Sequence, residues 1–498
     1  MVNDISNNNI KGKKDFFLLF LILFSMILLS SLFSIIFNLN VDYVILFLSI
    51  VMIVVLFKFK PYIFIKYFFA IFYAVFMLCG LFLCNNSDIY LHEIAKYSHY
   101  NGSFPIGVVY NIIFIASLVF FDNYYSKKFK YYISTKKIKK NKMINNLIYI
   151  IMFFSGLIMF MFVFKHPSFK YNIDRFAYTE LYMPNWLSKL QSMYIYCVPF
   201  LIFPIVYTNN KFKLKDFAKI VVSLLPFLLF GVWVGNKFGL FLNIFILLLS
   251  PLIVYISKKN LKFDEFENLQ SDNRLFPVMK RSIKKIIAFS FICLVVLLLP
   301  YYTLRGLNIV DSVFNRTAQQ GQLWWATYEI DRNQGMHLNE ISDEIIPLKS
   351  SFIGQKIGYT YGVYKIMKIT TPSSGYYAKL AIGSRYSAQG IEIAFYYFKY
   401  FGIILHAFFR GLIEAFLVNL LIKYVFSYKF INSFIISRLI MVNHAIFTQG
   451  DLYLLFSKET IFLIIVLIFV NMISRKGYTC DNKKKGRLIY EDISSYTC

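Results

Sequence analysis

Long apolar runs alternate with short polar connections along almost the whole chain, and this pattern predicts membrane-spanning helices. A helix needs about 20 apolar residues to cross the roughly 30 Å hydrocarbon core of a bilayer. About twelve runs approach or reach this length: Phe16–Phe37, Tyr43–Leu56, Tyr62–Cys84, Phe104–Phe121, Leu147–Phe164, Met193–Tyr207, Ala218–Val234, Phe238–Ile256, Ile286–Tyr301, Phe401–Ile422, Phe430–Phe447 and Leu452–Ser474. The second, sixth and eleventh runs carry the weakest signal.

Lysine and arginine gather in every second connection between these runs. Basic stretches precede the first run and follow the second, fourth, sixth, eighth, tenth and twelfth. Cytoplasmic loops of membrane proteins carry such an excess of basic residues. The alternation therefore predicts about twelve transmembrane helices with both termini in the cytoplasm. The first run is too long for a signal peptide and lacks a small-residue cleavage site, so we expect an uncleaved first helix.

Composition excludes an ordinary soluble domain. Hydrophobic residues make up 58% of the 498-residue chain, whereas soluble domains contain about 45–50%. The net charge of +27 would suggest nucleic acid in a soluble protein, but here it lies mostly between apolar runs. It therefore indicates cytoplasmic loops and contact with anionic membrane lipids, and no nucleic-acid partner is expected. The six cysteines form no CxxC motif, and no metal or cofactor is expected.

One connection on the non-cytoplasmic side is far longer than the others. It divides the chain into four parts: residues 1–301 with nine spans, an outside loop over 302–390, three more spans over 391–474, and a basic cytoplasmic tail over 475–498. The predicted fold class is thus an all-α polytopic membrane protein with one large outside loop in its C-terminal half.

Two arginine-bearing segments of the large loop are candidates for binding chemistry. They are Asn315–Trp325 and Gly383–Glu392. Arginine suits a diphosphate because its planar guanidinium donates two hydrogen bonds and stays charged. Amides match sugar hydroxyls, and indole faces stack on sugar rings. The candidates are Arg316 and Arg385 for a diphosphate, and Gln319, Gln322, Trp324 and Trp325 for sugars. Alternatively, the arginines form local salt bridges to Asp311, Glu329 or Asp331.

Smaller candidates lie in other outside connections. Arg175 belongs to a moderately long loop, and Lys237 occupies a tight glycine-flanked turn. Glu392 or His337 offers a general base. Each also has an ordinary interpretation: a loop residue, a lysine that reaches the membrane surface, a partner for Arg385, or a histidine without a function.

Charged residues also fall inside the apolar runs, where they are costly unless they pair or serve a function. They are Lys66, Arg410, Glu414, Arg438, Lys458 and Glu459. Arg410 and Glu414 are four residues apart and so share one face of a helix. Pairing between helices and a functional role both remain open for this set.

The whole chain resembles the Wzy-type polymerases that join O-antigen or capsule repeat units. The resemblance lies in the number of spans, the large loop in the C-terminal half, the Gly235–Gly239 turn, the Arg175 segment, and Arg385–Glu392 leading into Tyr400-Phe401-Gly402. It implies a location in the bacterial inner membrane with the large loop in the periplasm. The implied substrate is an oligosaccharide on undecaprenyl diphosphate, with a chain-length regulator as a possible partner.

The resemblance also implies roles for the candidate residues. Arg316, Arg385, Arg175 and Lys237 would stabilise charge on the departing lipid diphosphate. Glu392 or His337 would deprotonate the acceptor hydroxyl. A flippase for lipid-linked oligosaccharides is the first alternative, favoured by the charges within the spans but not by the large loop. A ligase-like glycosyltransferase is the second, and sequence separates it poorly from a polymerase.

Overall fold

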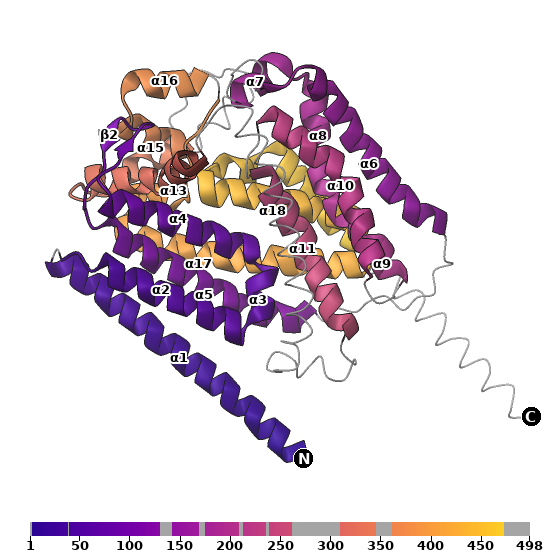
Figure 1. The fold of residues 1–498 in the computed structure, drawn as a ribbon, viewed down its shortest axis with the longest axis horizontal. Helices are drawn as coiled ribbons and strands as arrows, with labels where there is room; N and C mark the ends of the chain where they lie inside the picture. Colours follow the sequence, from indigo (N-terminus) through magenta and orange to yellow (C-terminus); the bar gives the residue numbers. More distant parts are fainter. Residues whose placement is uncertain are drawn as a thin grey trace, which may run out of the picture.

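The computed structural model is built almost entirely from helices (Figure 1). It describes residues 2–37, 39–129, 142–168, 175–208, 213–235, 239–260, 309–344, 361–381 and 383–472. The main helices are α1 (Val2–Phe37), α2 (Asp42–Phe59), α3 (Pro61–Lys66), α4 (Phe68–Asn86), α5 (Ser103–Phe129), α6 (Lys142–Lys165), α7 (Arg175–Tyr182), α8 (Asn185–Cys197), α9 (Phe203–Thr208), α10 (Leu214–Val234), α11 (Gly239–Asn260), α13 (Ile309–Asp331), α15 (Gly362–Thr370), α16 (Ser373–Ala381), α17 (Ile391–Phe426) and α18 (Phe430–Gln449). Short 3-10 turns are η2 (Val198–Ile202), η5 (Leu338–Glu344) and η6 (Leu452–Phe456), and a last helix covers 458–472.

Eight helical segments in the described residues are long and apolar enough to cross a membrane. They are Asp42–Phe59, Phe68–Asn86, Ser103–Phe129, Asn146–Lys165, Asn185–Tyr207, Lys215–Val234, Ile391–Phe426 and Phe430–Gln449. Leu18–Ser34 and Asn243–Ile256 are shorter apolar helices. The protein is therefore an all-α, multi-pass membrane protein. The expected span Ile286–Tyr301 and the basic tail lie outside the described residues, so twelve spans and cytoplasmic termini stay predictions.

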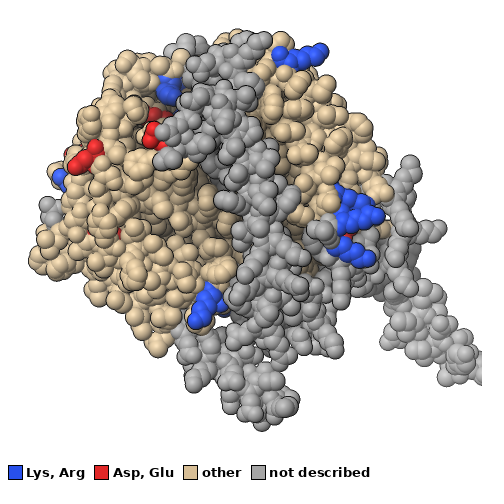
Figure 2. Space-filling view, viewed as in Figure 1, with Lys and Arg blue, Asp and Glu red and all other residues tan. Residues whose placement is uncertain are grey.

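The outer surface of the bundle suits a lipid environment. Large apolar side chains are exposed on α6, where Phe154 is 55% and Ile158 54% accessible, and on the last helix, where Phe469 is 61% accessible. Figure 2 shows a described surface with charged side chains only in small, separate groups. Soluble monomers rarely expose so much contiguous apolar surface, whereas lipid tails solvate it.

The long connection at 302–390 is largely helical where the structure describes it. Its first described helix, α13, packs along α4, and the two backbones meet at Gly80 and Gly321. A methyl group on Gly80 would lie 2.1 Å from the carbonyl oxygen of Thr317, so only glycine fits there. The segment expected as an outside loop thus places one helix against a membrane-spanning one.

A small cap lies at the end of the bundle where α4 ends and α5 begins. It comprises the hairpin of β1 (Tyr90–Leu91) and β2 (Lys96–Tyr97) with η5, α15 and α16. Figure 1 shows α13, α15, α16 and β2 gathered at this end. Helices η5 and α15 contact α17, so the cap fixes the start of that helix.

Helix α17 folds back on itself near its start. Lys399 has non-helical angles (φ 53°, ψ −140°) that divide the 36 residues. In a straight helix Gly390 and His406 would be about 24 Å apart, yet a methyl group on Gly390 would lie 2.6 Å from the His406 ring. Residues 391–398 therefore lie beside the start of the long segment 400–426. Gly402 permits this approach because it has no side chain: an added methyl group would lie only 2.2 Å from the carbonyl oxygen of Ala394.

Candidate functional site

Residues 384–398, which we call the inserted segment, pass into the helical bundle. Each residue from 385 to 389 is tied to a different part of the structure. Ser387 accepts a hydrogen bond from Gln320 (3.0 Å), and the Ala388 carbonyl accepts one from Tyr73 (3.2 Å). The Gln389 carbonyl accepts one from Tyr110 (3.1 Å). These bonds place Gln389 and Gly390 between α4, α5 and the long segment of α17.

Arg410 is the cation that faces the tip of the inserted segment. Its side chain is buried, and its Nη1 donates to the Tyr110 hydroxyl (3.0 Å), to the Gln389 carbonyl (3.4 Å) and to the Gln389 amide oxygen (3.3 Å). The guanidinium also lies 4.6 Å from the centre of the Phe114 ring. Among the described residues it forms no ion pair, and its hydrogen-bond partners are neutral; the carboxylates of Glu392 and Glu414 act on it electrostatically from beyond ion-pair distance. Such a guanidinium is available to an anion.

Glu392 lies two residues beyond this tip and is fully buried. Its Oε2 accepts a hydrogen bond from the Gln389 backbone N–H (3.2 Å), which fixes the carboxylate at the start of α17. Its Oε1 has no hydrogen-bond partner among the described residues. Because an unpaired buried oxygen is costly, a ligand or water at this position would stabilise the site. Glu392, a candidate base from sequence, therefore lies in the same site as Arg410.

The two arginine-bearing segments predicted from sequence lie side by side. The Gln320–Ser387 hydrogen bond joins α13 to the inserted segment. Arg316 is partly buried and donates to Gln319 (2.9 Å), while its Nε has no partner among the described atoms. The Nε–H of Arg316 therefore remains available to donate a hydrogen bond to a ligand. The amide oxygen of Gln319, in contrast, already accepts a hydrogen bond from Arg316.

Arg385 has a different environment from the one expected. Its Nη1 lies 2.6 Å from both carboxylate oxygens of Asp451, and its guanidinium lies over the Tyr364 ring at 4.7 Å. Burial favours the neutral guanidine, but Asp451 and Tyr364 outweigh it and raise the pKa of Arg385. The salt-bridge interpretation thus holds with Asp451, a partner outside the expected set of Asp311, Glu329 and Asp331.

The residues expected to bind sugars are mostly interior. Trp324 and Trp325 are fully buried, and their ring N–H groups donate to the carbonyls of Ser103 (2.9 Å) and His99 (2.8 Å). Gln322 is buried and donates to Glu93. In this conformation the indole faces are covered by protein, so a sugar role for either tryptophan would require a rearrangement.

His337 lies in the cap rather than beside Arg410. Its Nε2 is 2.8 Å from Asp331, and its ring stacks on Tyr396 with centroids 4.0 Å apart. The same buried carboxylate accepts a hydrogen bond from Lys399 (2.5 Å), the residue at the fold in α17. His337 thus belongs to a cluster that holds this fold in place.

The third predicted group lies in another part of the bundle. A methyl group on Gly235, at the end of α10, would lie 3.6 Å from Cβ of Arg175 on α7. The structure therefore places Arg175 beside Gly235, the first residue of the predicted glycine-flanked turn. Lys237 lies outside the described residues.

Two of the other cations within the spans, Lys66 and Arg438, are paired. Lys66 bonds to Asp122 (2.5 Å) and Asn419 (2.8 Å) in a buried network, and Arg438 pairs with Glu459. Sequence reasoning missed Tyr73, Tyr110 and Gln389 as site residues. Nothing in their local sequence distinguishes them, because their role arises from contact with Arg410 and the inserted segment.

The fold and this site define a multi-pass α-helical membrane protein with a buried polar centre, which contains the Arg410 guanidinium and the Glu392 carboxylate, beneath a small cap. The described residues contain no group of three or more metal-ligating side chains. Residues 356–464 match a family of unknown function, DUF6418. The match spans the inserted segment, α17 and α18, and thus includes Glu392 and Arg410. No curated protein and no solved structure matches the chain.

Proposed function

We propose that this protein polymerises oligosaccharide repeat units carried on undecaprenyl diphosphate, at the periplasmic face of the bacterial inner membrane. The observation that carries the proposal is Arg410. It is a buried guanidinium held by Tyr110 and Gln389 without an ion pair among the described residues. A lipid diphosphate would supply the missing negative charge, and its tail would remain in the bilayer.

The chemistry of such a reaction suits the two groups at the tip of the inserted segment. Transfer of the growing chain breaks a sugar–phosphate bond, and negative charge develops on the departing lipid diphosphate. Arg410 would stabilise that charge in a site with little water, where a fixed cation acts most strongly. The free Oε1 of Glu392 would accept the proton of the acceptor hydroxyl. Arg316, whose Nε has no partner among the described atoms, would assist from α13.

A flippase for the same lipid-linked units is the second candidate. The observation in its favour is the set of polar side chains that continues from Arg410 deeper into the bundle, at Glu414 and in the Lys66 network. Deletion of the gene separates the candidates. Loss of a polymerase leaves lipid core capped by one repeat unit on a polysaccharide gel, whereas loss of a flippase or a ligase leaves bare core.

Complementation with variants then tests the site. Glu392→Gln keeps the shape of the side chain but cannot accept a proton, and it should leave the single-unit pattern. The matched control is Glu459→Gln, because Glu459 is an exposed carboxylate on the last helix. Long chains with Glu392→Gln, at normal protein abundance, would remove Glu392 from the mechanism. Bare core in the deletion strain would overturn the polymerase itself.

A further inference from the structure

Glu414 lies one helical turn beyond Arg410 on α17 and is not used by the proposed reaction. It is only partly buried, although it lies within a membrane-spanning segment. Among the described residues it has no hydrogen bond and no ion pair. A carboxylate in this position is costly when charged unless water or a proton reaches it.

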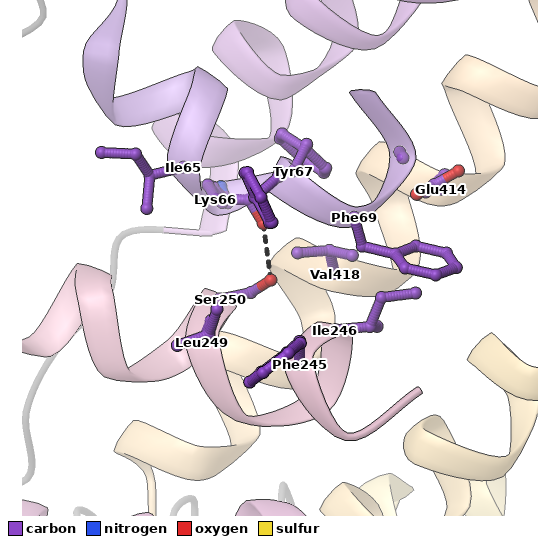
Figure 3. Close-up of a pocket in the computed structure, with 12 residues that line it drawn as sticks. Ile65, Lys66, Tyr67, Phe69, Phe245, Ile246, Leu249, Ser250, Glu414 and Val418 are labelled. Atoms are coloured by element: carbon purple, nitrogen blue, oxygen red, sulfur yellow. Dashed lines mark hydrogen bonds between the residues drawn. The ribbon is translucent and has the colours of Figure 1, made fainter. Parts of the chain in front are cut away.

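Two pockets meet at Glu414. One lies between α17 and α18 and is lined by Arg410, Glu414, Leu417, Ile440, Asn443 and His444, with Ile246 and Phe447. The other lies between α3, α4, α11 and α17, and its lining includes Lys66, Tyr67, Ser250 and Glu414. Ile246 and Glu414 belong to both linings. Figure 3 shows the Glu414 carboxylate at one end of the second pocket and Lys66 and Ser250 at the other.

Further polar groups lie at the other end of the second pocket. The Lys66 carbonyl accepts a hydrogen bond from Ser250 (2.6 Å), and the Lys66 amine bonds to Asp122. The Tyr67 hydroxyl also donates to Asp122 (2.6 Å). Proton-exchanging side chains therefore occur at successive depths of the bundle, from the Arg410 site through Glu414 to this network.

The chemistry around Glu414 identifies its ligand. A carboxylate offers no hydrogen-bond donor or positive charge to an anion, and the described residues hold no group of three or more side chains suited to a metal ion. The charged or titratable side chains around it are Arg410 on α17, His444 on α18, Lys66 on α3, Tyr67 before α4 and Tyr110 on α5, while α4 and α11 present Phe69 and Ile246. A proton fits a lone carboxylate between two small pockets.

We propose that Glu414 exchanges a proton between the two pockets and so carries protons across this bundle. The O–H bond of the protonated carboxyl breaks as water in one pocket accepts the proton, and water in the other pocket then protonates the carboxylate. One proton moves per cycle, and no group is oxidised or reduced. The proposal goes beyond polymerisation and does not depend on it.

The test is proton uptake by purified protein in lipid vesicles that contain a pH-sensitive dye. A potassium gradient with valinomycin supplies the driving force, and no sugar substrate is present. Wild-type vesicles should acidify faster than protein-free vesicles, and Glu414→Gln should lower the rate to the protein-free value. Glu459→Gln should keep the wild-type rate. A wild-type rate equal to that of protein-free vesicles, or an unchanged rate in Glu414→Gln, overturns the proposal.

A second measurement covers the case in which Glu414→Gln does not fold. Dicyclohexylcarbodiimide reacts with protonated carboxyl groups in apolar surroundings, and it can be applied to the wild-type protein in the same vesicles. Inhibition of uptake with the label on Glu414 in the mass spectrum supports the proposal. Uptake that persists after Glu414 is labelled contradicts it.

Discussion

Lys66, at the end of α3, and Arg410, on α17, are both buried, yet their charges have opposite surroundings. The Lys66 amine bonds to the Asp122 carboxylate at 2.5 Å and to Asn419 at 2.8 Å. Arg410 bonds only to the neutral groups of Tyr110 and Gln389 among the described residues. A cation that forms an ion pair with a carboxylate is already neutralised. A cation whose hydrogen-bond partners are all neutral can still form an ion pair with an anionic ligand. This difference separates a structural charge from a candidate site.

The largest expected effect, a loss of stability, comes from breaking the ion pair between Lys66 and Asp122. Lys66→Met leaves the Asp122 carboxylate buried and uncompensated, which typically costs about 3–5 kcal/mol. We expect a large loss of thermal stability in detergent. Lys66→Met combined with Asp122→Leu should recover much of the loss, because no charge is then left alone. A double variant as unstable as the single one would show that Asp122 does not cause the loss.

Removal of Arg410, the cation without an ion pair among the described residues, should lower the activity and leave the fold intact. Arg410→Gln is expected to lower the rate of chain transfer by about 100-fold or more, the usual effect of losing one group that stabilises developing charge. Turnover of a lipid-linked repeat unit by purified protein measures this effect. Arg438→Gln, which removes a cation paired with Glu459, is the control and should retain activity. Equal losses in both variants would argue against a special role for Arg410.

The fold in α17 supports the Arg410 site, and a single methyl group tests it. Gly402→Ala places that methyl 2.2 Å from the Ala394 carbonyl, so residues 391–398 must move away. We expect a loss of about 1–3 kcal/mol, typical of overpacking, together with reduced activity. Gly335→Ala is the matched control, because nothing lies within 4 Å of the added methyl. Thermal unfolding and turnover of both variants provide the measurement.

The smallest expected effect concerns pH and the cap. A hydrogen bond from Lys365 lowers the pKa of Glu340 below its ordinary value of 4.5. The resulting stability is present above that ordinary value and is lost as the pH falls through the lowered one. Because the Glu340 side chain is 43% accessible, we expect less than about 1 kcal/mol. Hydrogen exchange of η5 and α15 should rise at acidic pH, and Glu340→Gln should remove this dependence.

The membrane spans were well predicted because their signal is local. A run of apolar residues long enough for a bilayer is helical in almost any context, since backbone groups in lipid must bond within the segment. Thus α2, α10 and α18 lie within four residues of the predicted runs at both ends, whereas α4 begins six residues after its run and α5 ends eight residues beyond it. The fold at Lys399 was not predicted, because the predicted run begins at Phe401 and the residues before it carry no signal that they form a helix packed back against it.

The sequence identified only part of the candidate site, because a local pattern does not show which distant residues meet in the fold. Glu392 and the segment around it stood out by composition, and Arg410 stood out as a charge in a span. The sequence could not show which arginine, Arg385 or Arg410, lacks an ion pair, because the side chains that contact each one lie far away in the sequence. Asp451 is 66 residues from Arg385, and Tyr110 is 300 residues from Arg410.

By itself the sequence determined that this is a helical, multi-pass membrane protein, and it named most of the charges that matter. Hydropathy and chain length suffice for that, because each span must satisfy the bilayer alone. Only the tertiary structure decided which charges are neutralised and which face a pocket. Electrostatic pairing falls off over a few ångströms in a bundle, so it depends on which helices pack together.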